Sequence, residues 1–197
     1  MLKEKLQGFY PIPDADFEKL AGFIFEKQLR KKECLINEDE LQEDIFFVTE
    51  GVLRKYFRRD KHEVITQFFL EGDFANAMIS FYTGTPSHYS IEAIEPSTCL
   101  GIHKKDLERV LAEVPSLEKL YRIILASLYI KKEMQEYDKA RLTKQERFIS
   151  FCDSQTDLLQ RVPQKFIASY LEIAPETFCR MKHVRYKAAR KAIDASN

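Results

Sequence analysis

Between residues 25 and 103, short runs of β-branched, aromatic and other apolar residues alternate with turn residues. This alternation predicts strands over residues 34–37, 45–49, 52–58, 64–70, 89–94 and 98–103. Strands at regular spacing, joined by tight turns, favour an antiparallel sandwich or barrel over a parallel sheet. A short helix over residues 76–82 interrupts the strands, and a helix over residues 14–24, capped by Asp14, precedes them.

From residue 104 onward the spacing of apolar residues is helical. A short helix is expected to end before Pro115, and residues 116–137 predict a long helix that is apolar over much of its circumference. Such a helix buries two faces, of which one can cover the β-rich part of the chain. The other face has the spacing of a two-stranded coiled coil, interrupted by a serine: Ile123, Ser127, Ile130, Met134 and Tyr137. The pattern fits either a dimer through this face or a core helix within one chain.

The last quarter of the chain predicts a group of short helices. Thr143 and Glu146 have the spacing of a capping box, which opens one of them. Pro163 and Pro175 each stand in the first turn of a helix, with a short turn between the two helices. The small residue Ala168 lets the two helix axes come close where they cross. This is the geometry of a helix-turn-helix, whose second helix can enter the major groove of DNA.

The charge distribution points to a polyanionic partner. The 197 residues include 31 basic and 31 acidic side chains, but residues 1–115 carry a net charge of −6 and residues 116–197 one of +6. The second helix of the pair, residues 176–191, has six basic residues and one acidic residue. A basic helix gains binding free energy when nucleic acid releases its counterions. The alternative is a solvated helix whose late basic residues complement the helix dipole.

Several other classes of protein find no support in the sequence. The four cysteines form no CxxC pair, so we expect no metal site and no cofactor, and free thiols fit a cytoplasmic protein. No apolar run approaches the roughly 20 residues of a transmembrane helix, and we expect no signal peptide. The motifs of zinc peptidases, serine hydrolases, P-loop proteins and dinucleotide-binding enzymes are absent, so we expect no enzyme.

Several short motifs follow one another in order along most of the chain. They are FFVTEGVL at 46–53, FLEGDF at 69–74, IEAI at 91–94, LTKQERF at 142–148, IASYL at 167–171 and PETFCR at 175–180. In this order and spacing they resemble the Crp/Fnr family of transcription regulators. The resemblance implies an α+β fold with an antiparallel β-roll, jelly-roll-like, as sensor domain over residues 1–115. It further implies a dimerisation helix over residues 116–139 and a helix-turn-helix DNA-binding domain without a full wing over residues 140–197.

The resemblance also implies which residues contact DNA. Glu176 and Arg180 match positions that read bases: a carboxylate can accept from cytosine N4, and a guanidinium can bond to guanine O6 and N7. The alternative is an ion pair between these two side chains along one helix. Pro175 stands where some relatives have a base-reading arginine, which predicts a shorter half-site. Gln164 and Thr177 match positions that often contact phosphate. The complete expected DNA-binding set is Gln164, Glu176, Thr177, Arg180, His183 and Lys187.

At the effector site, the chain lacks the residues that the family uses to bind cyclic nucleotides. Family members that bind cyclic nucleotides hold the ribose with a Glu and the cyclic phosphate with an Arg, but here Ala77 and Ser87 stand at these positions. Without a fixed cation to offset the desolvation of a phosphate, we expect no binding of cAMP or cGMP. Five residues are candidates for a pocket that binds another effector, and the alternative is that they are ordinary core and rim residues. They are Met78, Tyr82, Ser87, His88 and Tyr89.

The sequence therefore predicts a cytoplasmic, homodimeric, DNA-binding transcription regulator. Its two recognition helices would read symmetric half-sites about one helical turn apart. The expected partners are double-stranded DNA, a second copy of the chain and, by resemblance, RNA polymerase, with no membrane. The sequence leaves open an unidentified small-molecule effector or none. The alternative is a ligand-sensing or scaffold dimer that has lost specific DNA binding.

Overall fold

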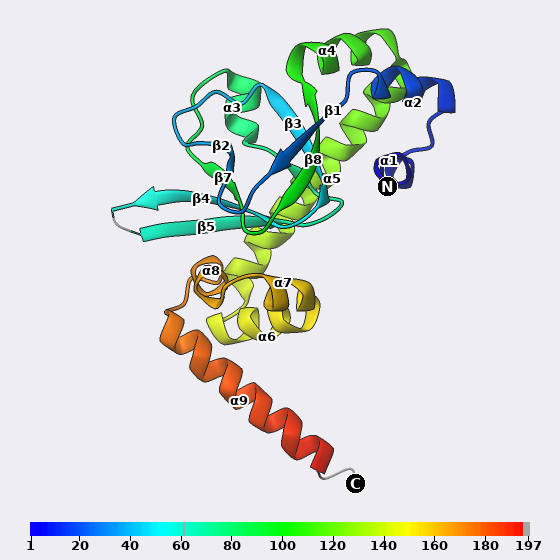
Figure 1. Cartoon of the computed structure of the whole chain (residues 1–197). Coiled ribbons are helices and arrows are strands. Elements are labelled where there is room, and N and C mark those ends of the chain that lie inside the picture. Colours follow the sequence, from blue (N-terminus) through cyan, green and yellow to red (C-terminus); the bar gives the residue numbers. More distant parts are fainter. Residues whose placement is uncertain (61, 195–197) are drawn as a thin grey trace.

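The protein consists of a β-roll, one long helix that leads away from it, and a group of short helices at the far end (Figure 1). The structure is a computed structural model that describes residues 1–60 and 62–194, with the backbone alone from residue 186 onward. Strands and helices are both major parts of the molecule, which confirms the α+β class. Within the described residues, no helix combines the length and the apolar character needed to cross a membrane.

Two antiparallel sheets form the roll, as the spacing of the strands predicts. One has the strand order β1-β8-β3-β6 and the other the order β2-β7-β4-β5. The bounds are β1 Phe25–Leu29, β2 Cys34–Ile36, β3 Asp44–Glu50, β4 Leu53–Arg59, β5 His62–Phe69, β6 Phe74–Ala75, β7 Ser90–Ala93 and β8 Ser97–His103. Inward-facing residues of both sheets meet in the core, among them Leu29, Phe46, Val48, Leu53, Phe69 and Ile91.

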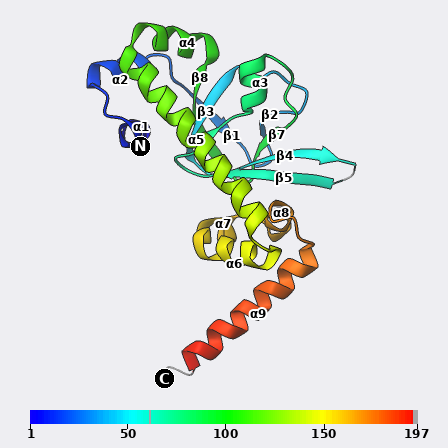
Figure 2. The same ribbon diagram turned by 180° about the vertical axis from the view of Figure 1, so that it is seen from behind.

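Helices cover the outer face of the sheet that contains β3 and β8. They are α1 Leu2–Phe9, α2 Asp14–Ala21, α4 Lys104–Glu113 and the first half of α5 Pro115–Arg141, which runs along the back of the roll (Figure 2). On α5, Leu117, Leu120 and Ile124 are buried in the cluster that these helices share. The buried face of α5 that these residues form is the first of the two buried faces expected for the long helix. The remaining helix of the roll, α3 Met78–Thr83, follows β6 and precedes β7 in the chain.

The predicted cap of the second helix is wrong. The N-cap of α2 is Pro13, and no side chain caps this helix. Asp14 instead occupies the first turn, where its carboxylate lies 3.0 Å from the ammonium of Lys3 on α1. A carboxylate in the first turn still interacts favourably with the helix dipole, so Asp14 favours the helix start without capping it.

The helical unit after α5 comprises α6 Lys144–Ser154, α7 Thr156–Arg161, α8 Gln164–Tyr170 and α9 Pro175–Asp194. The predicted capping box is confirmed, because Thr143 and Glu146 exchange side-chain and backbone hydrogen bonds at the start of α6. Pro175 opens α9 as its first residue, as expected. Pro163 is the N-cap of α8 and so precedes the first turn instead of lying in it.

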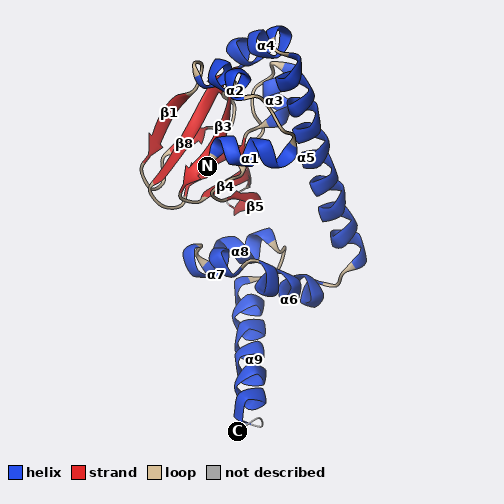
Figure 3. Ribbon diagram, turned by 90° about the vertical axis from the view of Figure 1, so that its right-hand side faces the viewer, coloured by secondary structure: helices blue, strands red, loops and turns tan. Residues whose placement is uncertain are grey.

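The helical unit packs against the β4–β5 hairpin of the roll (Figure 3). Ser169 of α8 bridges the two parts: its Oγ accepts from the backbone nitrogen of Ile65 at 3.1 Å and donates to the carbonyl of Glu63 at 3.0 Å. The ring of Tyr170 lies 5.4 Å from that of Phe68 on β5. One apolar cluster therefore runs from β5 through α8 into the helical unit, and this fixes where α9 projects from the molecule.

Candidate nucleic-acid interface and effector region

Helices α8 and α9 are joined by a tight turn. The backbone of Glu172 in this turn is left-handed, with a φ of +58°, and the nitrogen of Ile173 donates to the carbonyl of Ala168 at 3.0 Å. Ala168 and Phe178 are fully buried where the two helices meet. The ring of Phe178 also packs edge-on against Phe148 of α6. The turn and this buried contact fix the direction of α9 relative to α8.

One face of α9 is open to solvent over its first turns. Glu176, Arg180 and His183 are exposed on α9, Thr177 is half-buried, and Gln164 is exposed at the start of α8. The thiol of Cys179 lies 3.7 Å from Oε1 of Gln164, so the beginnings of both helices share one surface. Among the described side chains, neither Glu176 nor Arg180 forms an ion pair, so the alternative of a pair between them finds no support. The side chain of Lys187 lies outside the described residues.

The basic residues of α9 do not all have the same role. Arg185 donates to the carboxylate of Asp153 at 2.5 Å and to the carbonyl of Ile149 at 3.4 Å. Both partners are on α6, so Arg185 holds α9 against its own unit. Arg180 and the neighbouring Lys182 point into solvent. A phosphate or base could therefore approach Arg180 without breaking an ion pair.

The second half of α5 presents an apolar face to solvent. Ile130, Met134 and Tyr137 are 61%, 53% and 57% exposed. The hydroxyl of Ser127 donates to the carbonyl of Ile124 in its own helix at 2.7 Å, so the polar residue on this face is already hydrogen-bonded. The face is not buried within the chain, which removes the alternative of a single-chain core helix for its exposed part.

The candidate effector residues fall into two groups. Ser87 is 2% exposed, and its hydroxyl accepts from the backbone nitrogen of Tyr89 at 3.1 Å and donates to the carbonyl of the same residue at 2.7 Å. These bonds fix the loop before β7 and occupy the hydroxyl. His88 between them is exposed. Ser87 therefore shapes the loop, and its hydroxyl is not free for a ligand.

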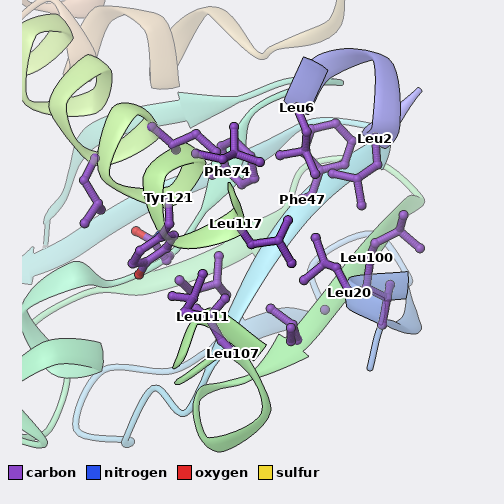
Figure 4. A pocket seen from close by; sticks show the side chains of 18 of the residues that line it. Leu2, Leu6, Leu20, Phe47, Phe74, Leu100, Leu107, Leu111, Leu117 and Tyr121 are labelled. Carbon is purple, nitrogen blue, oxygen red and sulfur yellow. The ribbon is translucent and has the colours of Figure 1, made fainter. Parts of the chain in front are cut away.

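The other group lies on α3 and faces α5. The hydroxyls of Tyr82 and Tyr121 are 2.5 Å apart, and burial raises the pKa of Tyr121. Met78 lines an apolar cavity of about 90 Å³ beneath α1, α4 and α5, and Figure 4 shows side chains such as Leu117 that fill its walls. A cavity of ~150 Å³ accepts a benzene, and this one is smaller. We therefore assign it to packing between helices and sheet.

A charged residue that the sequence analysis did not single out lies beside Tyr89. The ammonium of Lys55 on β4 is 4.5 Å from the centroid of the Tyr89 ring and donates to the carbonyl of Asn76 at 3.3 Å. Burial lowers the pKa of Lys55 to about 8, and the positive charge of Lys132 is a smaller contribution in the same direction. The sequence contains an indication of this difference. Consecutive residues of a strand point to opposite faces of the sheet, so Arg54 and Lys55 point to opposite faces.

Comparison with known proteins agrees with this architecture. Residues 26–114 match the family model described as a cyclic nucleotide-binding domain. The chain therefore contains a domain of this type, formed by the roll. No curated protein matches the chain.

Solved structures share the fold over most of the chain. FixK2 from Bradyrhizobium japonicum is 22% identical, with a TM-score of 0.68 over 84% of this chain and 86% of its own. The global regulator CLP from Xanthomonas campestris is 12% identical, with a TM-score of 0.70 over 89% and 93%. The catabolite activator protein of Thermus thermophilus is 13% identical, with a TM-score of 0.57 over 94% and 88%. At these identities the likeness shows the fold alone, which the chain shares with these three proteins over most of its length.

Proposed function

We propose that the protein is a DNA-binding transcription regulator of the Crp/Fnr type. Residues 1–115 form its sensor domain, residues 116–139 its dimerisation helix and residues 140–197 its helix-turn-helix domain. The observation that carries the proposal is the exposed polar face of α9, with Arg180 and Glu176 in solvent directly after a tight turn. The early turns of a recognition helix are those that reach base edges in the major groove.

In this proposal, the exposed apolar face of α5 pairs with the same face of a second copy of the chain. Two copies paired along Ile130, Met134 and Tyr137 would cover apolar surface that one copy leaves in water. A twofold pair also sets the separation of the two α9 helices, so the DNA site has two symmetric half-sites about 34 Å apart. The protein would act in the cytoplasm, with RNA polymerase as a further partner.

Selection of bound DNA from a random pool by the purified full chain tests this function. Enrichment of an inverted repeat with half-site centres about 10 base pairs apart would support both DNA reading and the dimer. A single enriched half-site would contradict the dimer but keep DNA recognition. No enrichment, with weak binding that does not depend on salt concentration, would favour the alternative of a sensing or scaffold dimer without DNA recognition.

The roll is expected not to bind cAMP or cGMP, and to respond to a different effector or to none. Ala77 is the N-cap of α3 and offers no carboxylate for a ribose, while the Ser87 hydroxyl is already bonded within its loop. CLP is described as responsive to c-di-GMP, a cyclic dinucleotide, so a related fold responds to a molecule other than cAMP or cGMP. Calorimetry with cAMP and cGMP is expected to show no binding, and a Kd at or below roughly 10 µM would contradict this.

A further inference from the structure

A cleft of about 300 Å³ lies between β5, the second half of α5 and the helical unit, near the place where the helical unit packs against the roll (Figure 3). Its lining combines Gln67 and Phe68 of β5 with Lys139 of α5 and with residues of α6 and α8. Among the described residues of α9, none lines it. A volume of this size is enough for a small molecule, and such a molecule would contact the roll, the long helix and the helical unit at once.

One side of this cleft is apolar. The ring of Tyr170 lies 5.4 Å from that of Phe68 and 5.8 Å from that of Phe151, and these three rings form an aromatic wall. Leu158 and Leu171 line the cleft as well and are buried. An apolar lining of this kind favours a ligand with an apolar body, because contact between the two releases water from both surfaces.

Two cations of the cleft converge on one carboxylate. Nη2 of Arg147 lies 3.7 Å from Oε2 of Glu172, and Nζ of Lys139 lies 3.4 Å from Oε1 of the same side chain. Both cations line the cleft, whereas Glu172 does not. The side chain of Glu172 is 54% exposed, so these contacts with it are weak. Arg147 and Lys139 are thus close enough together to bind a single carboxylate.

Arg147 has hydrogen-bond donors that the chain does not use. A guanidinium has five N–H donors, and the hydrogen bond that Arg147 forms runs from Nη2 to the carbonyl of Leu171 at 3.4 Å. Among the described residues, Nε is buried without an acceptor, and Nη1 has no acceptor either. A cation with unmade hydrogen bonds in a largely buried position costs free energy. Since this side chain lines the cleft, its Nη1 donors are available to an anion there.

The acidic residues of the lining already have basic partners. Asp73 lies 3.4 Å from Lys131, and Asp138 lies 3.1 Å from Arg141. Lys132 adds a further positive charge to the lining. The charge of the cleft that remains after this pairing is therefore positive, and it attracts an anion.

We propose that the cleft binds a small organic acid, whose anionic group lies between Arg147 and Lys139 and whose apolar body lies against the aromatic wall. The anionic group, a carboxylate or a phosphate, accepts charge-assisted hydrogen bonds from the guanidinium and the ammonium. It replaces the carboxylate of Glu172 between these two cations, so Glu172 competes with the ligand. The site is separate from the DNA-binding face of α9 and does not depend on it.

Thermal unfolding of the full chain in buffer of constant ionic strength tests the site, with phenylacetate and phenyl phosphate as separate probes. At least one of them, at ten times its Kd, should raise the Tm by roughly 3–6 °C. A response to phenylacetate alone identifies a carboxylic acid, and a response to phenyl phosphate alone a phosphate monoester. At the same concentration, benzyl alcohol, which has the ring without the charge, and acetate, which has the charge without the ring, should each give a smaller rise. No rise with either acid, or an equal rise with benzyl alcohol, would overturn the proposal.

Three variants test which residues hold the anion. Lys139→Met, at a position that is 44% exposed, should raise the Kd of the probe about fivefold, because one exposed charged contact is lost. Glu172→Gln should lower the Kd about threefold, because it removes the competing charge and keeps the shape of the side chain. Arg147→Met should abolish the response. If Arg147→Met does not fold, the opposite shifts expected of the other two variants still decide the proposal.

Arg122→Met and Glu118→Gln are the matched controls. These two residues form an exposed ion pair at 3.8 Å on the first half of α5, outside the lining of the cleft, and each control should leave the Kd unchanged. A general effect of net charge would shift the Kd in the controls as much as in Lys139→Met and Glu172→Gln, and binding of the probe to α9 would leave it unchanged in all four. Either result would overturn the proposal. The measurement contains no DNA, so its outcome is independent of whether α9 recognises DNA.

Discussion

Arg161 of α7 donates two hydrogen bonds to Glu71, from Nη1 to Oε2 at 3.0 Å and from Nη2 to Oε1 at 2.6 Å. Glu71 lies in the turn between β5 and β6 and also accepts from the backbone nitrogen of Gly51 at 2.8 Å. The Nε of Arg161 reaches Glu95 at 3.0 Å. The side-chain hydrogen bond from Arg161 lowers the pKa of Glu71 to about 2. One guanidinium therefore ties the helical unit to two carboxylates of the roll.

Arg161→Ala is expected to lower the free energy of unfolding by about 1 kcal/mol at pH 7, a modest value because the paired side chains are partly exposed. The pKa of Glu71 is lower in the folded than in the unfolded state. The contribution of this pair is therefore present above pH ~4.3 and is lost as the pH falls towards 2. Urea unfolding at pH 7, 4 and 3 should show the difference between wild type and variant shrinking.

Arg141→Ala serves as the control for that prediction. Arg141 forms an exposed pair with Asp138 at 3.1 Å, three residues back on α5, and such pairs contribute about 0.3–0.5 kcal/mol. If Arg161→Ala costs no more than this control, the contact of Arg161 with Glu71 does not hold the two parts together.

The left-handed turn at Glu172 predicts an order among its variants. At a φ of +58° a residue with a Cβ is strained by about 1 kcal/mol relative to glycine. Glu172→Gly relieves this strain but loses the approach to Lys139 and Arg147, whereas Glu172→Ala loses the same contacts and keeps the strain. Glu172→Gly should therefore melt about 2–4 °C above Glu172→Ala by calorimetry. Equal melting temperatures would show that the turn relaxes out of the left-handed region.

The exposed apolar face of α5 predicts a dimer that dissociates when charged side chains are placed on this face. Ile130→Lys with Met134→Lys places two charges on this face, and a charge buried there without a partner is costly. Since both side chains are more than half exposed in one chain, the double variant should remain folded and sediment as a monomer. Glu136→Lys, an exposed substitution away from this face, should remain a dimer. A double variant that still sediments as a dimer would place the interface elsewhere.

Lys55 should make stability depend on pH in the alkaline range. Its pKa is lowered to about 8 in the folded chain, whereas in the unfolded chain it stays near 10.4. Between these values the unfolded state binds more protons, so this group makes stability rise with pH. Below pH 8 the full cost of the buried charge remains, and Lys55→Met should be up to about 3 kcal/mol more stable than wild type in anion-free buffer. The advantage should shrink between pH 8 and 10, and urea unfolding at each pH measures it.

Much of the fold could be predicted from the sequence because strong local patterns coincide with buried faces. The strands with apolar alternation, the capping box at Thr143 and the proline at the start of α9 are all where the pattern places them. The edge strand β1, with the sequence FEKQL, was missed because its charged residues leave no clear alternation. The two-residue strand β6 is too short for any period, and α1 has no side-chain cap to mark its start.

The candidate sites were harder to predict, because sequence neighbours need not point into one space. Met78 and Ser87 are close along the chain, yet the first faces α5 and the second bonds within its own loop. On α9 the helical period separates the buried Phe178 from the exposed Arg180, so the sequence was sufficient to predict which of these two side chains is buried.

Arg180 is expected to read a base, because it is exposed in the second turn of α9, the part of a recognition helix that enters the groove. Arg180→Ala should cost about 1–3 kcal/mol on the preferred site and relax the preference at one base pair per half-site. Lys187, whose side chain lies outside the described residues, is predicted from its position to contact phosphate. Lys187→Ala should weaken all sequences alike and lower the salt slope by about one unit per protomer. Fluorescence anisotropy on cognate and scrambled duplexes over a salt series measures both. Equal weakening of both duplexes by Arg180→Ala would make Arg180 a backbone contact, and no change with either variant would show that α9 does not lie in the groove.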